Sequence, residues 1–320
     1  MLTTALLSAP WVAPLVRAVT TGLIVVLASA VAEAAGPFWG ALVISLPVTA
    51  GPAYVFMALE HDAGFIAGAA LNGFAANAAT GAFLIVYAKR GPTGSLPGAF
   101  GAAVATWLVS ALAIAQVAWT PLTALLLNGA VYGAGLVLCQ ARVRPSYAPS
   151  PVARRRWLDL LVRAVAVALF VTGVLAVSAV LSPARTGVIA AFPMALSCTI
   201  VILHPRVGGA ATAHLASTAI RGVFGFGLTL LTLHLLAESR GVATGLVSAL
   251  LVSLAWSAGL LGVQRLQMRR RPRGDADPVR APGQSSGAPQ HTHSTHRAPR
   301  RHGRPGGRRR APREADRRHP

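Results

Sequence analysis

The sequence predicts an all-α integral membrane protein of about nine transmembrane helices, built as two inverted four-helix repeats joined by a linker helix. Three observations lead to this prediction. The 320 residues are 54% hydrophobic and only 12% charged, whereas a soluble domain carries roughly 25% charged residues. A five-residue motif recurs 146 residues further along the chain, and basic residues gather in a few loops and in the C-terminal tail.

Long apolar stretches define the predicted spans. A helix needs about 20 mostly apolar residues to cross a hydrocarbon core of ~30 Å. The stretches that meet this length lie near residues 14–34, 37–59, 63–88, 97–117, 120–140, 157–181, 184–204, 208–236 and 242–264.

An internal duplication relates the two halves of this apolar region. The motif Leu15–Val19 returns as Leu161–Val165, an offset of 146 residues. One shared offset through several anchors indicates a repeat, although single matches between apolar segments arise easily by chance. The other anchors at this offset are Pro37 with Pro183, Pro47 with Pro193, and Gly81 with Gly227. The predicted division is residues 1–119 as membrane repeat 1, 120–155 as the linker helix and a basic loop, 156–265 as membrane repeat 2, and 266–320 as the tail.

Lysine and arginine residues in the loops set the predicted orientation. With the N-terminus outside, the Lys89–Arg90 pair, the Arg-rich loop at 142–156 and the tail face the cytoplasm, and the loop at 60–62 faces outward. Four helices return the chain to its starting side, and the linker crosses once more. The two repeats would then have opposite orientations, an architecture common among secondary transporters.

The tail is polybasic. Residues from 265 onward hold 16 Arg and four acids, so they carry +12 of the formal charge of +20. With so few large apolar residues the tail cannot offset its ordering entropy, and we expect it to be disordered. Arg269–Arg271 should meet anionic lipid headgroups, each contributing ~1 kcal/mol. The histidines at 291, 293 and 296 would suit a transition metal, but a solvated tail is the preferred interpretation, so no metal or cofactor is predicted.

Prolines interrupt two apolar segments at matching places. Pro47 follows Ser45 and precedes Thr49, and Pro193 precedes Ser197. Proline removes an amide donor and clashes with the preceding turn, so each helix should kink or break there. Such paired interruptions indicate a transporter's binding site, and the alternative is a plain kink packed against neighbouring helices.

A polar stripe in the 208–236 segment is the second candidate site. His214, Ser217, Thr218 and Arg221 are spaced i, i+3, i+4 and i+7, so they share one helical face. A mid-membrane arginine is costly and normally faces the bundle interior or a water-filled cavity, where its fork suits a carboxylate or phosphate. The alternatives are snorkelling or a structural pair with a backbone carbonyl. The 63–88 segment offers Asn72, Asn77 and Thr80 on the corresponding face.

Other polar and sulfur-containing residues have simpler interpretations. Arg17 and Arg163 recur one turn into their segments, and we expect both to reach headgroup phosphates. Cys139 and Cys198 lie in apolar segments, which favours small buried side chains over a disulfide. We find no enzyme signature, such as paired membrane carboxylates, a nucleophile elbow or a metal-ligand cluster, so we expect no catalytic residues.

The proline motifs around Pro47 and Pro193, together with the Leu203–Gly209 stretch, resemble those of uncharacterised polytopic bacterial inner-membrane proteins. The resemblance covers residues 1–264 and implies placement in the inner membrane, with no assigned catalytic residues. Two functions remain open at this point. One is a secondary transporter for a small solute, with an anion favoured, and the other is a membrane scaffold whose basic tail binds anionic lipid or an acidic partner.

Overall fold

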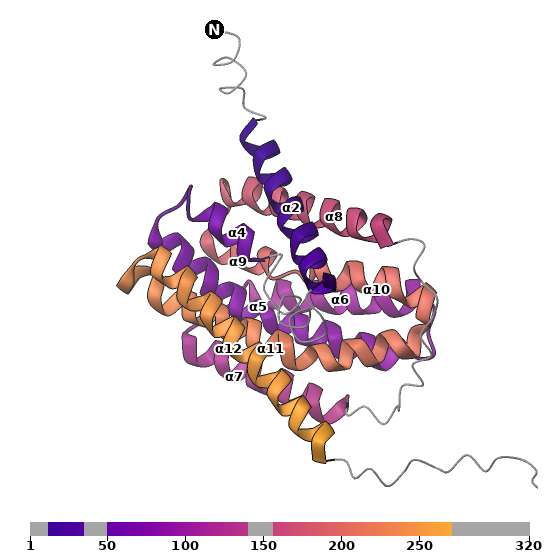
Figure 1. The fold of residues 1–320 in the computed structure, drawn as a ribbon. Helices are drawn as coiled ribbons and strands as arrows, with labels where there is room; N and C mark the ends of the chain where they lie inside the picture. The colour runs from indigo at the N-terminus through magenta and orange to yellow at the C-terminus, as the bar shows by residue number, and fades with distance from the viewer. Residues whose placement is uncertain (1–11, 35–49, 140–155, 271–320) are drawn as a thin grey trace, which may run out of the picture. The chain divides into compact units, whose positions relative to one another are not determined.

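The structure, a computed structural model, describes residues 12–34, 50–139 and 156–270, and this part of the chain is entirely helical (Figure 1). Seven of its helical segments are long and apolar enough to cross a membrane. The chain is therefore a multi-pass membrane protein. The helices are α2 (Val12–Ala34), α4 (Ala50–Met57), α5 (Ala63–Arg90), α6 (Leu96–Ile114), α7 (Pro121–Leu138), α8 (Arg156–Ser178), α9 (Pro183–Ala190), α10 (Met194–Val207), α11 (Gly209–Arg240) and α12 (Val242–Arg270).

Two predicted spans need correction, and a third lies partly outside the described residues. The span predicted at 184–204 is two helices, α9 and α10, and α10 continues through Pro205 to Val207. α12 extends to Arg270, so the first residues assigned to the tail are helical. Of the span predicted at 37–59, the structure describes only α4 and the turn after it, and the rest of that span, the loop at 142–155 and the tail from 271 lie outside the described residues.

Local capping explains where the long helices begin. The Asp62 carboxylate accepts a hydrogen bond from the Phe65 amide at 2.7 Å and caps α5, and the Ser95 side chain caps α6. α11 and α12 instead begin after Gly208 and Gly241, whose φ angles of 85° and 88° suit glycine. α7 begins with a capping box between Thr120 and Thr123.

α5 is the central helix of the described bundle. It packs against α6, α7, α9 and α11, and its buried face consists mainly of alanine and glycine. Small side chains allow close helix approach, which is the principal source of packing energy between helices in lipid. The contact between α5 and α11 is the most extensive in the bundle.

α5 and α11 cross in antiparallel directions. A Cβ atom on Gly64, at the start of α5, would lie 3.3 Å from Glu238 Oε1 at the end of α11. At the opposite end of the crossing, a Cβ atom on Gly91 would lie 3.1 Å from the Ala213 Cβ. The first residues of the two helices, Ala63 and Gly209, are separated by the offset of 146 residues seen in the sequence.

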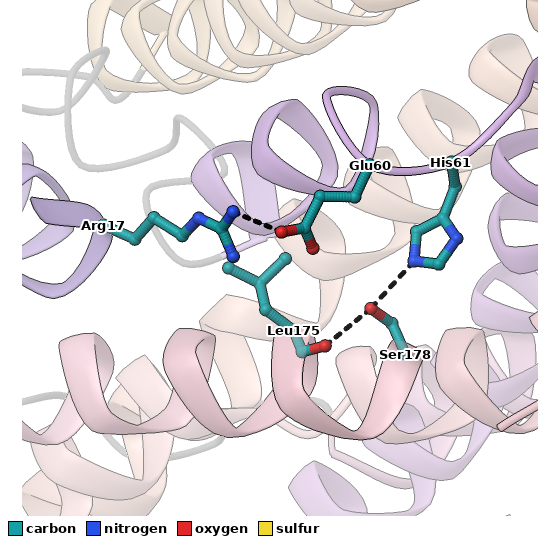
Figure 2. Close-up of polar contacts among 5 residues, drawn as sticks. All are labelled: Arg17, Glu60, His61, Leu175 and Ser178. Atoms are coloured by element: carbon teal, nitrogen blue, oxygen red, sulfur yellow. Dashed lines mark hydrogen bonds and ion pairs between the residues drawn. The ribbon is translucent and has the colours of Figure 1, made fainter. Parts of the chain in front are cut away.

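Two ion pairs hold the ends of α2 and α8 to neighbouring segments. Arg17 on α2 pairs with Glu60 after α4, and Asp159 on α8 pairs with Arg206 at the end of α10. Figure 2 shows the first pair, with His61 pointing toward Ser178 on α8 at 3.0 Å. Glu60 and Arg206 are 146 residues apart and have opposite charges, whereas their partners Arg17 and Asp159 are 142 residues apart, so only one residue of each pair occupies a corresponding position.

Candidate functional site

The candidate membrane span Pro183–Val207 is broken into two helices, α9 and α10. α9 ends at Ala190 and α10 begins at Met194, with Pro193 immediately before it. Proline has no amide to continue the helical ladder, and the Met194 amide bonds the Phe192 carbonyl at 2.8 Å instead of the carbonyl four residues back. The predicted interruption at Pro193 is therefore a break between two helices.

Side chains from α5 and α6 hold the broken backbone. The Thr80 hydroxyl donates to the Ala191 carbonyl at 3.0 Å, and Trp107 Nε1 donates to the Thr80 hydroxyl at 3.2 Å. The Trp107 ring also packs edge-on against Phe192, with ring centroids 4.9 Å apart. Backbone polar groups freed inside a membrane must find partners in the protein, and here a threonine supplies one.

A second buried polar cluster lies where α5, α7 and α11 meet. Asn77 Nδ2 donates to the Asn128 side chain at 3.2 Å and to the Val223 carbonyl at 3.1 Å. Asn128 in turn donates to the Phe74 carbonyl at 2.7 Å, and the Tyr132 hydroxyl donates to the Asn77 carbonyl at 2.9 Å. Both asparagines are at most 1% exposed. Their hydrogen bonds are made within the protein, so this cluster joins three helices.

The first residues of α10 bring another polar group into the interior. Ser197 is 6% exposed, and its hydroxyl has no partner among the described residues. Two positions on, the Thr199 hydroxyl accepts a hydrogen bond from Arg163 Nη2 at 2.6 Å. We expected Arg163 and Arg17 to reach headgroup phosphates. Both instead bond to protein groups, because neighbouring helices place acceptors within reach of their guanidinium groups.

The α11 stripe has a different environment. The Ser217 and Thr218 hydroxyls donate to carbonyls of their own helix, those of His214 and Leu215. The His214 Nδ1 atom is buried and has no hydrogen-bond partner among the described residues. Arg221 is exposed, and Trp256 of α12 bonds only its backbone carbonyl, at 3.0 Å.

The predicted site residues fall into two separate groups, one on α5 and at the helix break and the other on the α11 stripe. In the first group, Asn77 joins α5 to α7 and α11, and Pro193 follows the backbone that Thr80 holds. Asn72, also on α5, bonds the Gly68 carbonyl of its own helix. No hydrogen bond joins the stripe side chains to those of α5 or α10 within residues 50–139 and 156–270. Ser45, Pro47 and Thr49 lie outside the described residues.

Sequence reasoning missed Asn128 and Trp107. A signal was available for Asn128, since a polar residue in the middle of an apolar span is costly and normally faces the bundle interior. Trp107 gives no such signal, because tryptophan is mostly apolar and its sequence position does not identify the group that its indole N–H contacts.

Among the residues that the structure describes, no group of three or more His, Cys, Asp or Glu side chains could hold a metal ion. Comparison with known proteins gives no matching family model, curated protein or solved structure.

Proposed function

We propose that this protein is a secondary transporter for a small anionic solute, formed by two inverted four-helix repeats that α7 joins. The observation that carries the proposal is the helix break between Ala190 and Met194, held against α5 by Thr80. Discontinuous helices at the interface of two repeats form the substrate and ion sites of many transporters.

The contacts between α5 and α11 support the inverted repeat. Asn77 Nδ2 bonds the Val223 carbonyl, and these two residues are 146 positions apart. When two copies of a unit are related by a two-fold axis, residues at equivalent positions can touch each other only near that axis. Gly22 on α2 and Ala168 on α8 also occupy equivalent positions and lie close together. A Cβ atom added to Gly22 would lie 4.0 Å from the Ala168 Cβ.

Helix boundaries provide independent support. α5 and α11 begin 146 residues apart, and so do α6 and α12, at Leu96 and Val242. The antiparallel crossing of α5 and α11 is the arrangement expected when the two units have opposite orientations in the membrane. With the N-terminus outside, the basic end of α5 lies in the cytoplasm, which agrees with the distribution of Lys and Arg in the loops. Placement in a bacterial inner membrane remains part of this proposal.

Arg221 is the residue we propose to supply the positive charge. A guanidinium group can bind a carboxylate or phosphate through two parallel hydrogen bonds. His214, on the same face, is the second residue that we propose to contact the solute, since its Nδ1 atom has no hydrogen-bond partner among the described residues.

Thermal unfolding of the purified protein in the presence of candidate solutes tests this function. A ligand that binds only the folded state raises the free energy of unfolding by about 2.7 kcal/mol at a hundredfold excess over its dissociation constant. We expect stabilisation by one class of organic anion in the full-length protein and its loss in Arg221→Ala. Arg240→Ala, which removes an exposed arginine at the end of the same helix, is the control and should retain the response.

One result would argue against the transporter, and deletion of the tail then tests the alternative. Stabilisation by anionic lipid alone, with no response to any solute, would favour the scaffold whose basic tail binds lipid. Removal of residues 271–320 would then abolish the lipid response, whereas a transporter should keep its solute response without the tail.

A further inference from the structure

The first turn of α10 has two backbone amides without partners. The first amides of any helix have no carbonyl acceptor within that helix, and Pro193, the residue before α10, supplies no side-chain cap. The amides of Ala195 and Leu196 make no hydrogen bond in the part of the chain that the structure describes. Ala195 is the middle residue of the candidate membrane span Pro183–Val207. Lipid offers no acceptor to such amides, so a partner must come from within the protein or from a bound group.

Ser197 adds a third donor to this turn. The residue is 6% exposed, and its hydroxyl has no hydrogen-bond partner among the described residues. Side chains on a helix lean toward its N-terminus, so this hydroxyl is directed over the turn that holds the two amides. Buried polar groups in folded proteins are almost always hydrogen-bonded. The start of α10 therefore has three donors and no acceptor.

Arg163 on α8 brings a positive charge to the same turn. Its Nη2 atom donates to the Thr199 hydroxyl at 2.6 Å, and Thr199 in turn donates to the Ala195 carbonyl at 2.7 Å. A guanidinium group has several N–H donors, and the bond to Thr199 uses only one of them. Asp159, one turn earlier on α8, pairs with Arg206, and no carboxylate pairs with Arg163 within residues 12–34, 50–139 and 156–270.

The corresponding arginine in the first half of the chain has a different environment. Arg17 lies 146 residues before Arg163, and its charge is balanced by Glu60. The positions that correspond to Ser197 and Thr199 are Gly51 and Ala53, which have no side-chain donor. Only the second half combines an arginine without a carboxylate partner and a helix N-terminus without acceptors.

We propose that the first turn of α10 and Arg163 bind one small anion, of the size of a halide ion or a carboxylate group. The amides of Ala195 and Leu196 and the Ser197 hydroxyl donate hydrogen bonds to it, and the positive end of the helix dipole adds to the attraction. Arg163 supplies the full positive charge and further donors. A free inorganic anion and the carboxylate of an organic solute have the same chemistry here. The inference does not depend on transport or on Arg221, which is an exposed residue of α11.

Equilibrium dialysis of the purified full-length protein against radiolabelled chloride or radiolabelled acetate tests the site. We expect saturable binding of one anion per chain. A hydrogen bond to a charged group is worth about tenfold or more in affinity, so we expect at least that loss in Ser197→Ala and in Arg163→Ala. Ser197→Ala removes only a hydroxyl group and tests the site even if Arg163→Ala does not fold. The matched controls, which should bind as the unchanged protein does, are Arg185→Ala on α9 and Ser239→Ala on α11, both at exposed positions.

The two probes distinguish the sources of the anion. Chloride binding that organic anions do not displace indicates a free inorganic anion, whereas acetate binding that a stabilising organic anion displaces indicates the carboxylate of the solute. Arg221→Ala should keep the binding of chloride or acetate, so a failure of the proposed solute site leaves this site intact.

Three results overturn the proposal. One is the absence of saturable binding of either probe, as expected if water alone satisfies the donors of α10. Another is binding that Ser197→Ala and a folded Arg163→Ala both leave unchanged. The third is binding that is lost in Arg221→Ala and retained in Arg163→Ala.

Discussion

Gly187→Ala is expected to destabilise the bundle strongly. The added methyl group would overlap the Ala69 carbonyl oxygen of α5, and a backbone atom cannot swing aside as a side chain can. Overpacking typically costs 1–3 kcal/mol, and we expect about 3 kcal/mol here because two helices must separate. Thermal unfolding in detergent, followed by tryptophan fluorescence, measures the loss.

Gly173→Ala on α8 is the matched control. No atom lies within 4 Å of a Cβ atom at this position, so the substitution adds no steric overlap. Alanine is the better helix former by about 1 kcal/mol, and the control should be unchanged or slightly more stable. Equal stability of the two variants would contradict the close packing of α9 on α5.

Charge reversal at Arg206 has the second largest expected effect. Arg206→Asp would place a second carboxylate against Asp159, in a pair whose side chains are 25% and 24% exposed. Exposed pairs contribute about 0–1 kcal/mol, whereas breaking a buried pair costs about 3–5 kcal/mol. We expect Arg206→Asp to lower the midpoint of thermal unfolding, because it replaces an attraction between α8 and α10 with a repulsion.

Exchanging the two charges should restore most of this stability. The double variant Asp159→Arg with Arg206→Asp keeps opposite charges in contact between α8 and α10. Arg240→Asp, an exposed site at the end of α11, controls for the change in net charge. A double variant as unstable as Arg206→Asp alone would show that the ion pair does not hold α10 to α8.

The membrane class and several helix boundaries could be predicted from the sequence, because hydropathy and capping act locally. The predicted starts at 63 and 242 agree with α5 and α12, whose preceding residues, Asp62 and Gly241, are typical of helix N-termini. The C-terminal ends of the helices were less predictable. α12 continues to Arg270 because polar residues such as Gln264 and Arg265 favour a helix beyond the hydrocarbon, where hydropathy gives no signal.

The candidate site shows a similar limit. α11 contains His214, Ser217, Thr218 and Arg221, and the helix interruption expected at Pro193 lies between α9 and α10. Neither pattern could show that Thr80 and Trp107 hold the broken backbone, because those contacts join helices far apart in the sequence. Nor could the sequence show that Arg221 is exposed, with Trp256 of α12 bonded to its backbone carbonyl.

The central claim, that the two repeats have opposite orientations in the membrane, is tested most directly by cysteine accessibility at one pair of equivalent positions. Thr93, after α5, and Ser239, near the end of α11, are both exposed and lie 146 residues apart. Each is replaced by cysteine in a chain lacking Cys139 and Cys198, and a membrane-impermeant maleimide is applied from either side. Inverted repeats with the N-terminus outside predict that Thr93→Cys reacts only from the cytoplasmic side and Ser239→Cys only from the outside. Labelling of both positions from the same side would contradict the inverted arrangement.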